Sequence, residues 1–163
     1  VDPVPARQSA VRASGVENVY ERVPVEDPAL ARTFALALEC SGHEQAVLDA
    51  ARVVRKGGEV ALVGVPWARR ADLYVHELLR EIFFHYVTVR SGWEWEIPHH
   101  AADFRPHSIF GDYVTALRWL KQGKIYTEGL IRIHDPRHAQ TVYEDLVRQR
   151  ADGLFQLFEW NAS

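Results

Sequence analysis

The sequence contains no methionine and only one cysteine, Cys40, among its 163 residues. A single cysteine excludes a disulfide within the chain and any zinc site built from several cysteines. A reducing, cytoplasmic environment is therefore the location that we predict. The start at Val1 has neither the basic region nor the apolar stretch of a signal peptide. Together with the missing methionine, this start indicates a fragment, a processed product or part of a longer protein.

Long hydrophobic runs and a strong charge of one sign are also missing. No apolar run approaches the roughly 18 residues that a membrane-spanning helix requires. The net charge of −3 gives no electrostatic reason to expect nucleic acid or an anionic membrane as a partner. Hydrophobic residues make up 47% of the chain and charged residues 25%, which is typical of a globular domain with a buried core.

Segments typical of strands alternate with segments typical of helices. Residues 34–39 and 59–63 are short apolar runs, which predict strands buried on both faces. The helix predicted between them covers residues 43–55, with Ser41 as its N-cap and Glu44 closing a capping box. Gly57-Gly58 would end this helix. Further predicted elements are helices over 6–13, 76–84, 109–122 and 136–150, and strands over 86–90, 130–133 and 154–160. Strands separated by helices predict an α/β fold with a parallel sheet.

Ligands of such sheets bind beyond the carboxyl ends of the strands. The segments found there are Asp2, Cys40-Ser41-Gly42, Gly64-Val65-Pro66 and Ser91-Gly92-Trp93. Glycine allows a flat ligand to approach the backbone closely, so these strand ends are the candidate binding surface. Cys40 itself is predicted to be a buried strand residue and therefore inert as a nucleophile.

Several segments resemble the zinc-type medium-chain alcohol dehydrogenase family, in an order and spacing that cover nearly the whole chain. They are residues 38–43 (LECSGH), 50–65, 116–125 with its Gly-Lys-Ile ending, 130–134 (LIRIH) and 139–146. The resemblance implies an incomplete Rossmann-like parallel sheet with flanking helices, whose first strand and glycine-rich turn would lie before position 1. Residues 1–92 would be part of the dinucleotide-binding domain. Residues 93–163 would form a C-terminal α/β tail that returns to the catalytic domain.

The same resemblance implies NAD as the cofactor, with NADP as the alternative. Asp2 would accept hydrogen bonds from a ribose and repel a 2′-phosphate, and Arg7 would weaken that preference. The remaining predicted cofactor-binding residues are Cys40, Ser41 and Gly42 near the nicotinamide ribose, and Gly64, Val65, Ser91 and Gly92 near the nicotinamide. The catalytic zinc ligands and proton-relay residues would lie upstream, so no catalytic residue is assigned. The alternatives are helix caps for Asp2 and Ser41 and plain turns for the glycines.

A polar loop contains His99, His100, Asp103 and His107, residue types that hold zinc or another transition metal. Adjacent histidines seldom point to one ion, and a solvated loop explains the same residues. We predict no metal site in this chain, with the His99, His100, Asp103 and His107 cluster as the one alternative.

Three functions remain open from the sequence. The first is part of an NAD(P)-dependent oxidoreductase of alcohols, polyols or the matching carbonyl compounds, which contributes cofactor surface and dimer contacts. A small-molecule substrate and a homodimer or homotetramer would follow. The second is a methyltransferase-like module that binds S-adenosylmethionine. Residues 51–58 also resemble the helix-to-strand turn of such enzymes. The third is a non-catalytic remnant that serves as an oligomerisation module, with the strand at 86–90 on an open sheet edge.

Overall fold

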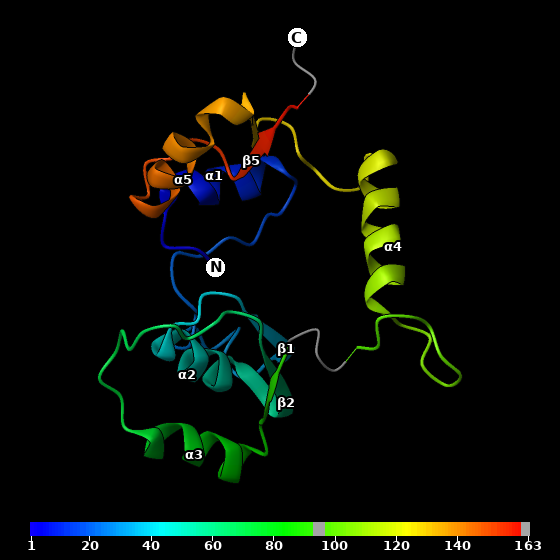
Figure 1. The fold of residues 1–163 in the computed structure, drawn as a ribbon. Helices are drawn as coiled ribbons and strands as arrows, with labels where there is room; N and C mark the ends of the chain where they lie inside the picture. Colours follow the sequence, from blue (N-terminus) through cyan, green and yellow to red (C-terminus); the bar gives the residue numbers. More distant parts are fainter. Residues whose placement is uncertain (93–96, 161–163) are drawn as a thin grey trace. The chain divides into compact units, whose positions relative to one another are not determined.

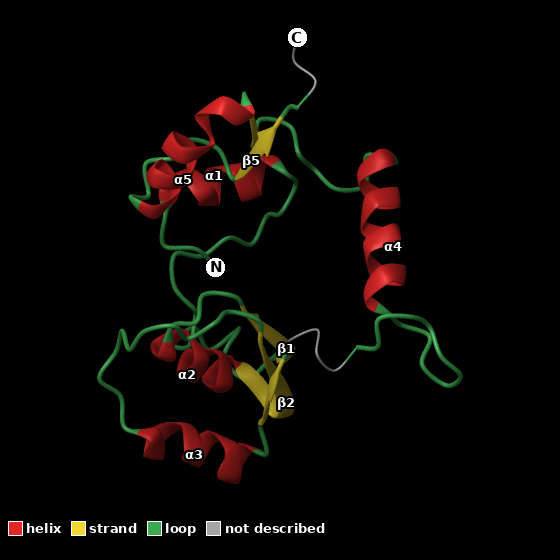
Figure 2. Ribbon diagram, in the orientation of Figure 1, coloured by secondary structure: helices red, strands yellow, loops and turns green. Residues whose placement is uncertain are grey.

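The computed structural model describes residues 1–92 and 97–160 (Figure 1). Its strands form two parallel sheets flanked by helices, which confirms the predicted α/β class (Figure 2). The chain divides into two compact units, Val1–Gly111 and Asp112–Ser163. The boundary that the resemblance implies after residue 92 stays a prediction.

The first unit is built around a three-stranded sheet with the order β1-β2-β3. Its elements are α1 (Pro5–Ala13), β1 (Phe34–Glu39), α2 (Glu44–Val53), β2 (Val54–Leu62), α3 (Val75–His85) and β3 (Thr88–Ser91). Helix α2 connects β1 to β2, and α3 connects β2 to β3, which is the arrangement that parallel neighbours require. Helix α2 packs along β1 and β2, and α3 packs on α2 and β2 (Figure 1).

The core of this unit lies between one face of the sheet and the two helices. Because side chains alternate along a strand, the registered residues Ala37, Val60 and Val89 share that face. They pack with α2 residues Ala50 and Ala51, both of which are buried. This packing keeps the three strand ends at one edge of the sheet.

The prediction that β1 is buried on both faces is wrong. Leu36 and Leu38 are 49% and 64% exposed, and Phe34 is also exposed. The reason is that α2 and α3 cover the opposite face, which holds Ala37 and Glu39. Glu39 is the one buried residue of β1, and its side chain is acidic.

The boundary between α2 and β2 also differs from the prediction. The helix ends at Val53 and the strand begins at Val54, so Gly57-Gly58 lies within β2 and does not end the helix. Gly57 has a left-handed φ of 71°, and the register between β1 and β2 shifts at this point. A bulge against β1, rather than a helix stop, therefore explains this glycine pair.

The start of α2 differs in the same way. The predicted cap Ser41 is replaced by His43, whose Nδ1 accepts from the backbone N–H of Gln45 at 3.2 Å. Glu44 does not close a capping box, because its carboxylate accepts from the backbone N–H of Arg70. Ser41 is instead engaged at the end of β1.

The second unit contains a two-stranded parallel sheet. Helix α4 (Ile109–Lys121) leads into it, followed by β4 (Ile131–His134), the 3-10 helix η2 (Pro136–His138), α5 (Ala139–Val147) and β5 (Phe155–Phe158). Gly123 follows α4 with a left-handed φ of 66°, as its predicted C′ position requires. Asp135 caps η2 by accepting from the backbone N–H of Arg137. No helix in residues 1–92 and 97–160 is long and apolar enough to cross a membrane.

Candidate functional site at the strand ends

The ends of β1, β2 and β3 lie side by side at one edge of the sheet. Glu39, Leu62 and Ser91 are register partners across the three strands. The backbone N–H groups of Val63 and Gly64 both donate to the Glu39 carbonyl oxygen at 2.8 Å, and Gly92 N–H donates to the Leu62 carbonyl oxygen at 2.8 Å. The structure therefore brings together the three segments predicted as cofactor surface: Cys40-Ser41-Gly42, Gly64-Val65 and Ser91-Gly92.

The carboxylate of Glu39 organises the end of β1. It accepts from the backbone N–H of Ser41 at 2.7 Å and of Gly42 at 3.0 Å, and the Ser41 hydroxyl donates to it in a short contact. The sequence reasoning missed this residue. The sequence did carry a signal for it, because Glu39 is the single acidic residue of an apolar strand and stands at its end. A carboxylate that is buried there needs several hydrogen-bond donors nearby.

The glycines at these ends fit against one another. A Cβ on Gly42 would lie 2.3 Å from the Val65 carbonyl oxygen, and a Cβ on Gly64 would lie 2.2 Å from the backbone nitrogen of Gly42. Gly92 is less confined, because its Cβ would meet Val63 Cγ2 at 3.0 Å. Contact between neighbouring strand ends thus accounts for Gly42 and Gly64 without a ligand, and contact with a cofactor stays a prediction.

Several of the predicted binding residues are open at this edge. Cys40, Ser41, Ser91 and Gly92 are exposed, whereas Gly42 is buried. The prediction that Cys40 is a buried strand residue is wrong, because β1 ends at Glu39 and Cys40 follows it. An exposed thiol at the strand ends makes this position accessible to reagents.

Asp2 and Arg7 lie at the start of α1 and form an ion pair. The Arg7 Nε lies 2.8 Å from Asp2 Oδ2, and Asp2 Oδ1 accepts from the backbone N–H of Val4 at 2.8 Å. The helix-cap alternative is not realised at Asp2, because Val4 is the N-cap of α1, no side chain caps this helix, and the backbone N–H that the Asp2 carboxylate binds is that of Val4. Its role toward a ribose stays a prediction.

The histidine loop does not assemble a metal site. Within the two described stretches, no three histidine, cysteine, aspartate or glutamate residues lie close enough to hold an ion. His100 instead stacks on Phe110, with ring centres 5.0 Å apart, and the backbone N–H of Phe110 donates to the His99 carbonyl oxygen at 3.2 Å. These residues do not fit a zinc ion.

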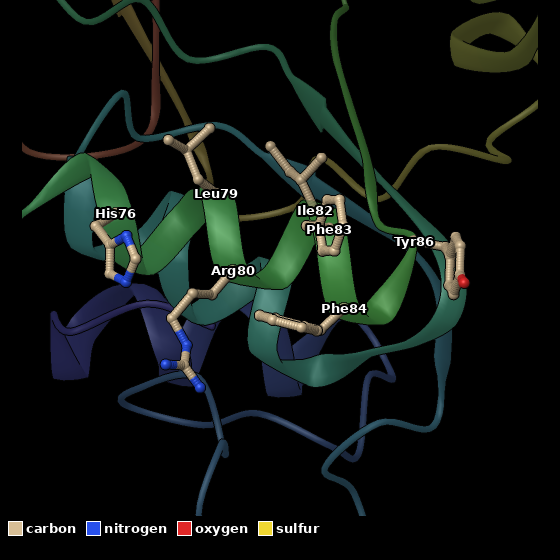
Figure 3. Close-up of a pocket in the computed structure, with 7 residues that line it drawn as sticks. All are labelled: His76, Leu79, Arg80, Ile82, Phe83, Phe84 and Tyr86. Atoms are coloured by element: carbon tan, nitrogen blue, oxygen red, sulfur yellow. The ribbon is translucent and has the colours of Figure 1, made fainter.

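A separate groove of about 600 Å³ runs along α3 (Figure 3). Most of its lining is apolar, and Arg80 lies over the ring of Phe84, 5.6 Å from its centre. Its lining residues are His76, Leu79, Arg80, Ile82, Phe83, Phe84 and Tyr86. None of them belongs to a strand end, so this groove is distinct from the candidate cofactor surface.

No family model matches the sequence, and no curated protein matches it either. Solved structures do match the fold. Galactitol-1-phosphate dehydrogenase from Escherichia coli is 19% identical with a TM-score of 0.63, over 92% of this chain and 42% of that one. Acetophenone reductase from Geotrichum candidum, in complex with NAD, is 12% identical with a TM-score of 0.65, over 94% of this chain and 39% of that one.

A third match is glucose dehydrogenase from Haloferax mediterranei in complex with NADP, Zn and gluconolactone. It is 16% identical with a TM-score of 0.54, over 86% of this chain and 35% of that one. The chain therefore spans about two fifths of the length of these enzymes. The predicted resemblance to zinc-type medium-chain alcohol dehydrogenases is confirmed for the fold.

Proposed function

We propose that this chain supplies the nicotinamide side of the cofactor surface in an NAD(P)-dependent oxidoreductase of alcohols, polyols or the matching carbonyl compounds. The observation that supports the proposal is the meeting of three strand ends at the carboxyl edge of a parallel sheet, where such folds bind ligands. The fold shared with dehydrogenases that bind NAD or NADP supports it independently.

The nicotinamide cofactor would carry the hydride, and the chain would hold and orient it. Ser41, Ser91 and Gly92 are exposed at the strand ends and would contact the nicotinamide and its ribose. The backbone of Gly64 and Val65, fixed between the other two ends, would line the same surface. We assign no catalytic residue and no zinc ligand to this chain.

NAD is the cofactor that we propose, with NADP as the alternative. Asp2 would accept from the ribose hydroxyls, while its ion pair with Arg7 offers a cation to a 2′-phosphate. A small-molecule alcohol or carbonyl compound is the proposed substrate of the whole protein. A homodimer or homotetramer in the cytoplasm completes the proposal, with β3 as the edge strand of the first sheet.

One observation disfavours the methyltransferase-like alternative. Methyltransferase sheets typically end in a reversed strand, so their last strands pair antiparallel. Strands β4 and β5 pair in parallel, from Ile131 with Phe155 to His134 with Phe158. We therefore retain the dehydrogenase function as the proposal.

The single cysteine offers a direct test. Because Cys40 adjoins the proposed ribose contact and is exposed, bound NADH should shield its thiol. We expect a maleimide reagent to label the chain several-fold more slowly at millimolar NADH, measured by intact mass over time. S-Adenosylmethionine at the same concentration should leave the rate unchanged.

The variant Cys40→Ser is the control, since it should take up no label and so assign all labelling to Cys40. Labelling rates that are identical with and without NADH would overturn the proposed function. Protection by S-adenosylmethionine alone would transfer the proposal to the methyltransferase-like alternative.

A further inference from the structure

Glu39 bonds to two strand ends at once. Its carbonyl oxygen accepts from Val63 and Gly64 after β2, and its carboxylate accepts from Ser41 and Gly42 after β1. The residue is only 5% exposed. Both carboxylate oxygens are used, because Oε1 accepts from Ser41 and Oε2 from Gly42.

A carboxylate suits this position better than any neutral side chain. Each of the three groups that contact it, two backbone N–H groups and one hydroxyl, is a donor. An ionised carboxylate accepts only, and hydrogen bonds to a charged acceptor are the stronger kind. A glutamine would place its NH₂ group against one of the donors, leaving a buried donor unpaired.

This arrangement limits what Ser41 offers to a ligand. Its hydroxyl has one donor proton and two acceptor lone pairs. The proton points to Glu39, and one lone pair accepts from the backbone N–H of His43 at 3.1 Å. What remains is a single acceptor lone pair on an exposed side chain that is hydrogen-bonded to a buried carboxylate.

We infer that Glu39 is a positioning residue that makes the end of β1 selective for a hydroxyl donor, such as a ribose hydroxyl, over a phosphate. A ribose hydroxyl would donate to the remaining lone pair of Ser41 Oγ. A phosphate carries negative charge near neutral pH, so the nearby carboxylate of Glu39 would repel it. The inference rests on the proposed function. It adds that the ligand group bound at this strand end is a hydrogen-bond donor and not an anion.

The test uses the full chain, with nicotinamide riboside and inorganic phosphate as separate probes. Backbone amide signals of Ser41, Gly42 and Gly64 would be followed by NMR during each titration. We expect the riboside to shift these signals in the natural chain and phosphate to leave them in place. In Glu39→Gln, riboside affinity should fall about tenfold, which is the effect of losing a hydrogen bond to a charged group. Phosphate should then shift the same amide signals, because the negative charge of Glu39 is gone.

Two further variants separate positioning from folding. Ser41→Ala removes an exposed hydroxyl together with its hydrogen bonds to Glu39 and His43. The two backbone N–H groups still bind the Glu39 carboxylate, so this variant should keep the fold and lose the riboside response. Glu59→Gln removes a carboxylate of the same sheet that pairs with Arg90, and both titrations should stay as in the natural chain. A folded Glu39→Gln chain with unchanged riboside affinity and no phosphate response would overturn the inference and leave the proposed function standing. A natural chain in which neither riboside nor NADH shifts these signals would overturn the proposed function itself.

Discussion

At the scale of single residues, Gly64 shows why a strand end can require glycine. Its φ is not left-handed, so backbone conformation does not require a glycine there. Its missing Cβ would lie 2.2 Å from the Gly42 nitrogen and 2.5 Å from the Cys40 carbonyl carbon. Both are backbone atoms, which cannot rotate away as the tip of a flexible side chain would.

We therefore expect Gly64→Ala to lower the free energy of unfolding by about 3 kcal/mol, the upper end for overpacking a tight site. Gly57→Ala is the matched control, because its Cβ would meet open space and only its left-handed φ of 71° is disfavoured. That substitution should cost about 1 kcal/mol. Urea unfolding followed by circular dichroism measures both. Equal midpoints for the two variants would contradict a steric role for Gly64.

At the scale of elements, the sequence was sufficient to predict where most helices and strands lie. The apolar run at Phe34–Glu39 predicted β1 with the bounds that the structure has, and the Gly-rich ends predicted a shared edge. Burial was not predictable, because whether a face of β1 is covered depends on which other elements pack there. The start of β2 was also missed, because it depends on pairing with another element. Val54 belongs to the strand because it pairs with Phe34 of β1.

The uncovered face of β1 leads to a prediction for this element. Leu38 is 64% exposed, so Leu38→Lys should change the free energy of unfolding by less than about 0.5 kcal/mol and reduce self-association of the chain. Val60 is fully buried on the opposite face, and Val60→Ala should cost about 2 kcal/mol. Urea unfolding and sedimentation measure the two effects. A Leu38→Lys chain as destabilised as Val60→Ala would show that this face is covered.

At the scale of the whole molecule, the two compact units have separate sheets and separate buried residues. Strands β1, β2 and β3 pair only with one another in the part of the chain that the structure describes, as do β4 and β5. The strand ends that we propose as cofactor surface belong to the first unit. The clearest electrostatic feature of the second unit is Asp135, which follows β4 and is the N-cap of η2.

The guanidinium of Arg137 and the backbone N–H of the same residue hold the pKa of Asp135 well below its ordinary value. A carboxyl with a lowered folded-state pKa stabilises the fold above its unfolded pKa, near 3.9, and loses that contribution as the pH falls further. We therefore expect Asp135→Asn to be less stable than the natural chain at pH 7. The difference should shrink progressively from about pH 4 downward.

The loss should be confined to the second unit. In thermal unfolding followed by amide NMR signals, residues of β4 and α5 should melt earlier in Asp135→Asn at pH 7, while those of β2 should melt as before. Asp72→Asn is the control, because that exposed carboxylate pairs with Arg69 in the first unit and should leave the signals of the second unit unchanged at every pH. If Asp135→Asn lowered the melting temperature of both units equally, the two units would unfold as one cooperative body. The proposed cofactor surface would then depend on the stability of the C-terminal unit.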